Sequence, residues 1–225
     1  MARCEQCIAR QLNSMKTLTK EELRKVTVCK RTLYYKKGEV IFNENEMLNG
    51  VYCVREGICK MSKLSANGKD HTVKLMGKGN LIGQRSIISG ERTHLSAVAV
   101  NDIELCFIPK DQILNSIKSN QEFSFDVLQN LAQDLREAED GLINMAQKTV
   151  RQRLAETLIY VGKTFGVNHD GFLSANLLRE DYASIIGTAT ESTIRILSQF
   201  KKEGLISTKG KMIRIESVHE LERVE

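Results

Sequence analysis

The chain has 225 residues, of which 41% are hydrophobic and 27% are charged, and its formal net charge at pH 7 is +5. This length suffices for one large domain or two modest ones. No apolar run reaches membrane-spanning length and the first residues lack a signal-peptide core, so we expect a cytoplasmic protein without membrane segments. The positive charge suits a polyanionic partner without requiring one.

Residues 1–28 begin with a CxxC pair, Cys4 and Cys7, and continue into a helical pattern. Six cysteines without a secretory signal favour core positions, metal ligands or redox groups over a disulfide scaffold. A lone CxxC is compatible with a pair of cysteines that has no functional role, with a zinc site or with a thiol redox site. Three further cysteines lie in strand-like apolar runs, where we expect buried core residues: Cys53, Cys59 and Cys106.

Short β-rich segments separated by glycine turns follow, as at Lys37-Gly38 and Glu56-Gly57. This pattern predicts a small barrel or jelly roll whose interior could hold a small ligand. The expected strands are 31–36, 39–43, 50–55, 58–64, 71–76, 95–100 and 103–108. A histidine-rich barrel metalloenzyme is disfavoured because the chain's histidines include no close pair: His71, His94, His169 and His219. We therefore expect no enzyme activity.

After Pro109 the pattern predicts a short helix over 110–119 and a long helix over 121–146. Apolar residues recur along the long helix at spacings of three and four, as in a heptad seam. The seam could pack on the chain's own barrel, but its length and its position between two domains favour a homodimer helix. Its residues are Leu128, Leu131, Leu135, Ala138, Leu142 and Met145.

Residues 179–204 predict a short helix, a glycine-bearing turn and a longer helix. Ala183 is small enough for two helices to cross closely, and Gly187 can take the positive φ of a tight turn. Ile196 is expected to anchor the second helix. We expect three other apolar residues of that helix to face the core as well: Ile194, Leu197 and Phe200.

The first turns of that second helix carry polar side chains suited to base reading. Arg donates two hydrogen bonds to guanine and Glu accepts one from cytosine, so Glu191 and Arg195 could read neighbouring base pairs in the major groove. Two other interpretations use the same residues. Thr188 and Glu191 fit a capping box, and Glu191 with Arg195 fits an ordinary ion pair one helical turn apart.

A winged extension follows the second helix. The pattern predicts two short strands, 205–208 and 212–215, joined by the turn Lys209-Gly210-Lys211. Between positions 195 and 214 the chain has six basic residues and one acidic residue. This segment is therefore a candidate phosphate-binding face.

The segment IIGTATESTIRILSQFKKEGLISTKGKMIRI resembles the winged helix of the Crp/Fnr family, which includes the cyclic-AMP receptor protein and the fumarate and nitrate reduction regulator. The resemblance implies an α+β fold in which a double-stranded β-roll of the cyclic-nucleotide-binding type precedes a dimerisation helix and a winged helix-turn-helix. We expect the sensor domain over 1–119, the dimerisation helix over 120–147 and the DNA-binding domain over 148–225.

The resemblance also implies the partners: double-stranded DNA, a second copy of the chain and RNA polymerase. Residues at the positions of Glu191 and Arg195 read the G·C pairs of a TGA-containing half-site in the family. This chain departs at two neighbours, with Thr190 in place of a base-reading Arg and Ile194 in place of a Ser. The expected DNA-binding residues are Thr188, Thr190, Glu191, Ser192, Arg195, Lys209 and Lys211.

Family members that bind cyclic AMP hold its ribose with a Gly-Glu pair and its phosphate with an Arg-Ser pair. Here the first pair is Gly83-Gln84. The second is either Arg92-Thr93, which lies closer to the first pair than in the family, or Leu95-Ser96, which aligns with the family pair after a small gap. The missing carboxylate and the displaced Arg disfavour cyclic AMP. The candidate effector pocket comprises Gly83, Gln84, Arg92 and Thr93, with no effector assigned.

The cysteines match part of another family site. Cys4, Cys7 and Cys106 correspond to three of the four thiolates that bind the [4Fe-4S] cluster of the fumarate and nitrate regulator. Asn13 stands in place of the remaining ligand, and a cubane takes four thiolates. No cofactor is therefore assigned with certainty, and an iron-sulfur cluster or zinc remains an alternative at Cys4, Cys7 and Cys106.

Two functional classes follow. The first is a homodimeric transcription regulator that reads an inverted repeat. The second is a metal, thiol redox or small-molecule sensor that acts through a partner other than DNA. Sequence-specific DNA affinity that depends on Arg195 distinguishes them.

Overall fold

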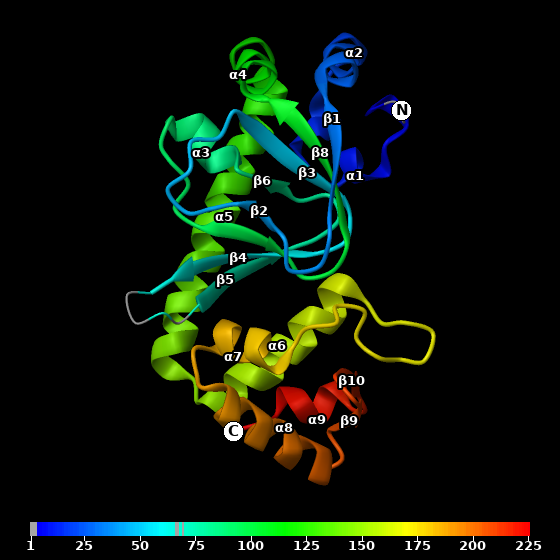
Figure 1. Cartoon of the computed structure of the whole chain (residues 1–225), viewed down its shortest axis with the longest axis vertical. Helices are drawn as coiled ribbons and strands as arrows, with labels where there is room; N and C mark the ends of the chain where they lie inside the picture. The colour runs from blue at the N-terminus through cyan, green and yellow to red at the C-terminus, as the bar shows by residue number, and fades with distance from the viewer. Residues whose placement is uncertain (1–3, 66–67, 69) are drawn as a thin grey trace. The chain divides into compact units, whose positions relative to one another are not determined.

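The computed structural model describes residues 4–65, 68 and 70–225, and the side chain of Cys4 lies outside this description. The chain divides into two compact units (Figure 1). The first contains the residues up to Lys63 together with Lys74–Glu137. The second contains Leu64–Val73 and Ala138–Glu225. Each unit is described separately below.

Two four-stranded antiparallel sheets form the predicted β-roll. One sheet has the strand order β1-β8-β3-β6 and the other the order β2-β7-β4-β5. All seven strands expected from the sequence are present, and β6 was missed because it has only two residues. The strands are β1 Arg31–Tyr35, β2 Val40–Phe42, β3 Gly50–Glu56, β4 Cys59–Leu64, β5 Asp70–Met76, β6 Leu81–Ile82, β7 Ser96–Ala99 and β8 Ile103–Pro109.

Short helices surround the roll. At the N-terminus, Thr19 caps α2 in a capping box with Glu22. The side chains of α1, η2 and α2 join the apolar core of the first unit through Ala9, Met15 and Leu23. These elements are η1 Cys4–Gln6, α1 Ile8–Gln11, η2 Ser14–Thr17, α2 Lys20–Cys29, α3 Gln84–Ser89 and α4 Lys110–Ser119.

The long helix α5 spans Gln121–Gln147. Phe123 and Val127 in its first turns pack into the core of the roll. Farther along, the predicted seam is largely uncovered, since Leu128, Leu135 and Leu142 are 62%, 61% and 73% exposed. Packing on the chain's own roll therefore does not account for this seam. No described helix is long and apolar enough to cross a membrane.

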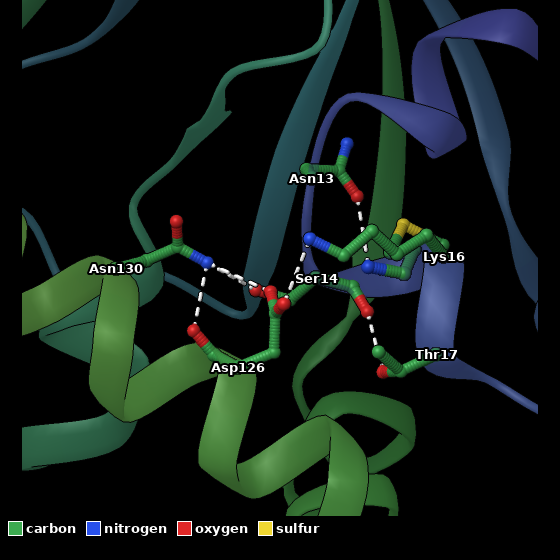
Figure 2. A network of polar contacts seen from close by, with 7 residues as sticks. Asn13, Ser14, Lys16, Thr17, Asp126 and Asn130 are labelled. Atoms are coloured by element: carbon green, nitrogen blue, oxygen red, sulfur yellow. Dashed lines mark hydrogen bonds and ion pairs between the residues drawn. The ribbon is translucent and has the colours of Figure 1, made fainter.

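A polar network attaches the N-terminal segment to α5 (Figure 2). The Lys16 ammonium lies 2.8 Å from an Asp126 carboxylate oxygen, and the Asn130 amide donates to Ser14 Oγ over 2.8 Å. Burial raises the pKa of Asp126, but hydrogen bonds from Lys16, Ser14 and Asn130 outweigh it and hold the pKa below its usual range. The carboxylate therefore stabilises this attachment at neutral pH and loses that effect only as the pH falls through the lowered pKa.

The second unit contains a winged helix-turn-helix (Figure 1). Thr149 caps α6 in a capping box with Gln152, and Leu154, Leu158 and Val161 form its fully buried face. Between α6 and α7, Val167 and Leu173 form an isolated antiparallel bridge. The elements are α6 Val150–Phe165, α7 Arg179–Ile186, α8 Thr190–Lys202, β9 Ile206–Lys209, β10 Met212–Ile215 and α9 Val218–Glu222.

Candidate DNA-binding site

The turn between α7 and α8 has the geometry expected from its sequence. Gly187 ends α7 in the left-handed region, at φ +65° and ψ +47°. Ala183 is buried, and its carbonyl accepts hydrogen bonds from the amides of Gly187 and Thr188. Because only glycine takes this backbone conformation cheaply, Gly187 fixes the direction in which α8 leaves α7.

We expect Gly187→Ala to destabilise the second unit by about 1–2 kcal/mol, the cost of a left-handed L-residue. A Cβ there would lie 3.4 Å from the Met145 sulfur, which is ordinary contact, so the cost comes from the backbone. Urea unfolding of the full chain measures it. Gly141→Ala is the matched control, because this helical position has open space around it and the change should stabilise by roughly 0.5–1 kcal/mol. Equal effects of the two changes would contradict the assigned role of Gly187.

One face of helix α8 is apolar and buried in the core of the second unit. Ile196, Leu197 and Phe200 are buried, as expected, and Thr193 is fully buried beside them. The expectation for Ile194 was wrong, because its side chain is 48% exposed. The helical period explains the difference: with 193, 196, 197 and 200 inward, position 194 falls in an adjacent row on the flank of the helix.

The outward face of α8 presents the candidate base-reading residues. Glu191 and Arg195 are exposed, while Thr190 and Ser192 are half-buried. Ala189 occupies the N-cap of α8 and makes no side-chain cap, so the capping-box interpretation of Thr188 and Glu191 is wrong. Within the described residues, Glu191 and Arg195 form no ion pair. Both side chains are therefore available to a ligand.

The wing is a two-stranded hairpin. Strands β9 and β10 pair with Met212 opposite Lys209 and Ile215 opposite Ile206. The connection is thus Gly210-Lys211, with Gly210 at φ +60°, one residue shorter than the expected turn. The guanidinium of Arg179 donates to the carbonyls of Lys211 and Gly210 over 3.2 and 3.4 Å. This arginine holds the wing against the start of α7.

Within the described part of the chain, the unpaired charges between positions 195 and 214 of the winged helix are all positive. The acid of the segment, Glu203, pairs with Arg151 at 2.6 Å. Arg214 pairs with Glu216 at 2.8 Å and lies over the Phe172 ring, which removes it from the candidate phosphate contacts. The exposed basic residues that remain are Arg195, Lys201, Lys202, Lys209 and Lys211.

Sequence reasoning missed one further positioning residue, Arg153 on α6. Its guanidinium donates to the Ile186 carbonyl at the end of α7 over 3.0 Å, and to the Lys148 carbonyl over 2.9 Å. Arg153 therefore caps two helix ends beside the reading helix. Nothing in the local sequence distinguishes it from a surface arginine, because its partners are distant backbone carbonyls.

The residues expected to form an effector pocket are committed to the roll itself. Gly83 is the N-cap of α3 at φ +84°, and a Cβ there would lie 2.6 Å from Leu48 Cδ1. Thr93 is buried, and its hydroxyl donates to the Asn43 carbonyl and accepts from the Glu46 amide. The Arg92 guanidinium donates to the Asn45 carbonyl over 2.9 Å. Gln84 is half-buried and supplies no charge for a phosphate or ribose.

The cysteines match a cluster site only in part. Cys7 and Cys106 line one cavity together with Cys53, which was expected in the core. Asn13 donates to the carbonyls of Ala9 and Gly79 and lies 3.4 Å from Cys53 Sγ, so this side chain has a hydrogen-bonding role. Among the described residues no three potential ligands are grouped to hold a metal ion. The described residues therefore do not fit a four-thiolate cluster, and Cys4 lies outside the described side chains.

A winged helix with an exposed polar reading face and a basic surround defines a DNA-binding protein. The model of a Crp-like helix-turn-helix domain agrees with this class and matches residues 152–224, and the model of a cyclic nucleotide-binding domain matches residues 32–120. The chain belongs to the Crp/Fnr family of transcription regulators.

Relatives resemble the chain over most of its length. A CRP-like cAMP-activated global transcriptional regulator of Mycobacterium tuberculosis is 26% identical over 84% of this chain and 85% of its own. The anaerobic regulatory protein of Bacillus subtilis is 28% identical over 79% of this chain and 76% of its own. Among solved structures, FixK2 of Bradyrhizobium japonicum superposes with a TM-score of 0.79 at 23% identity, covering 87% of this chain and 97% of that one.

Proposed function

We propose that the protein is a homodimeric regulator that reads an inverted repeat with a TGA-like half-site core through Glu191 and Arg195. The observation that carries this proposal is the exposure of both side chains on α8, without a partner among the described residues, on a helix whose opposite face is buried. Arg195 would donate to guanine and Glu191 would accept from cytosine. Thr188, Thr190, Ser192, Lys209 and Lys211 would add contacts to the backbone and flanking bases.

Dimerisation through α5 supports the same proposal. The exposed seam of Leu128, Leu135 and Leu142 needs an apolar cover, and a second copy of the helix supplies one with the same period. A parallel pair of α5 helices would place two reading helices about 34 Å apart, one turn of DNA. The two half-sites should therefore form an inverted repeat.

Regulation implies a second protein partner and a signal. Relatives named as transcription regulators favour RNA polymerase as that partner. Cyclic AMP is disfavoured as the signal, because Gln84 replaces the expected carboxylate and the Arg92 guanidinium binds the roll's own backbone. The protein would act in the cytoplasm, the compartment that holds the DNA.

Selection of binding sites from randomised duplex DNA tests this function. We expect the full-length protein to enrich inverted TGA-like half-sites whose centres lie about 10 base pairs apart. A selection with Glu191→Gln should lose the preference at one base pair of each half-site, because an amide no longer accepts from cytosine as a carboxylate does. Enrichment of no sequence at all, or the same motif with Glu191→Gln, would contradict the assignment.

A further inference from the structure

A small cavity in the first unit collects reactive groups that the DNA-reading function does not use. Three thiols line it, those of Cys7, Cys53 and Cys106. The cavity volume is about 20 Å³, which is room for one or two water molecules. A nucleotide cannot enter a space of this size.

Three cationic side chains line the same cavity: Arg10, Lys30 and Arg55. Lys30 is only 6% exposed, which is unusual for a lysine. Arg55 pairs with Glu104, whereas the buried Nε of Arg10 has no hydrogen-bond partner among the described residues. Cations beside thiols favour the thiolate form and stabilise an anionic leaving group.

Cys53 and Cys106 lie directly opposite each other on adjacent antiparallel strands, β3 and β8. Both side chains reach the same cavity, so they share one face of the sheet. Opposite residues have Cα atoms about 4.5–5.5 Å apart, within the range that a disulfide spans. Cβ atoms of directly opposite residues are typically about 4.5–5.5 Å apart, which is wider than a relaxed disulfide prefers. A bond here would be easily reduced, as regulatory disulfides are.

We propose that Cys53 and Cys106 form a reversible disulfide when hydrogen peroxide, or a peroxide as small, enters the cavity. One thiolate attacks a peroxide oxygen, the O–O bond breaks, and hydroxide leaves and takes up a proton as water. The second thiol attacks the resulting sulfenic sulfur, the S–S bond forms and a second water leaves. Two thiols are oxidised and one peroxide is reduced to two waters.

Asn13 links this thiol pair to α5. Its amide donates to Cys53 Sγ over 3.4 Å, and its carbonyl oxygen accepts from the Met15 amide over 2.9 Å. The next residues, Ser14 and Lys16, bind Asn130 and Asp126 of α5 (Figure 2). Formation of the S–S bond would change the sulfur that accepts from Asn13, and we expect this change to loosen the attachment. Resting on the proposed function, we infer that the disulfide changes DNA affinity through the dimer helix.

Cys59 supplies an internal control. It is fully buried in β4, where it pairs with Ala99 of β7. These two strands belong to the sheet that does not contain Cys53 and Cys106. Burial raises the pKa of the Cys59 thiol to about 12, so this sulfur stays protonated and unreactive at neutral pH. Cys59→Ala should leave the oxidation chemistry of the cavity unchanged.

The first test maps disulfides by mass spectrometry after the reduced full-length protein is treated with hydrogen peroxide and blocked with a thiol alkylator. We expect a Cys53–Cys106 cross-link in the wild type and in Cys59→Ala, none in Cys53→Ala or Cys106→Ala, and complete reversal by dithiothreitol. A bulky organic hydroperoxide should react far more slowly. The absence of the cross-link, or its replacement by one to Cys7, would overturn the assignment.

The second test measures affinity for an inverted repeat before and after oxidation. We expect a change of about 5- to 150-fold, the range typical of allosteric coupling. The change should be absent in Cys53→Ala and smaller in Asn13→Ala, which still forms the cross-link. A cross-link without a change in affinity would overturn the coupling. If the reduced protein binds no inverted repeat, the proposed function fails while the cross-link mapping remains valid.

Discussion

Arg195→Ala should lower the affinity for the inverted repeat by roughly 2–6 kcal/mol, because each of two half-sites loses a contact worth about 1–3 kcal/mol. This corresponds to about 30- to 20,000-fold in the dissociation constant. Affinity for unrelated DNA should change little. Arg195 is exposed and lies opposite the buried face of α8, so the fold should be unaffected. Fluorescence anisotropy with operator and scrambled duplexes measures both affinities.

Lys209→Ala is the matched control for Arg195. Lys209 is exposed at the wing turn, where a phosphate contact carries no base information. Its loss should weaken binding to all sequences alike and lower the slope of log affinity against log salt by about one per half-site. If Arg195→Ala also weakened all sequences equally, Arg195 would be a phosphate contact and the reading assignment would fail.

The double substitution Leu135→Glu with Leu142→Glu should yield a monomer. Burying a leucine contributes about 1.5–3 kcal/mol, and a symmetric dimer buries each of these residues twice. The lost burial is therefore roughly 6–12 kcal/mol, enough to dissociate a dimer at micromolar concentration. Sedimentation equilibrium measures the mass, and operator affinity should fall toward the level for unrelated DNA.

Gln129→Glu controls for the added negative charge on α5. Gln129 is exposed next to the seam residue Leu128 but lies outside the heptad positions. This variant should remain a dimer and bind the operator normally. A dimer that persists in the double leucine variant would show that the copies associate through another surface.

Much of this fold was predictable from local signals. The strands of the roll were readable because glycine turns bound short apolar runs, and the winged helix because Gly187 and the period of Ile196, Leu197 and Phe200 agree. Ile194 shows the limit of this reasoning. Its spacing from Leu197 fits a core face, yet only packing decides which of two adjacent helical rows faces inward.

The cavity and its link to α5 were not predictable, because they depend on contacts between distant parts of the chain. Cys53 meets Cys106 only through the register of β3 and β8. Asn13, which occupies the position of a metal ligand in the family, donates to the distant Gly79 carbonyl and to Cys53 Sγ instead. A sequence lists these side chains but gives no sign that they converge.

If two copies of α8 read two half-sites on one face of the DNA, the spacing of those half-sites is fixed, and changing that spacing tests the paired reading most directly. Affinity is measured for the selected operator and for the same operator with five base pairs inserted at its centre. The insertion turns one half-site to the opposite face of the duplex, so we predict that affinity falls to that of a single half-site. Equal affinity for both duplexes would contradict the paired reading of an inverted repeat.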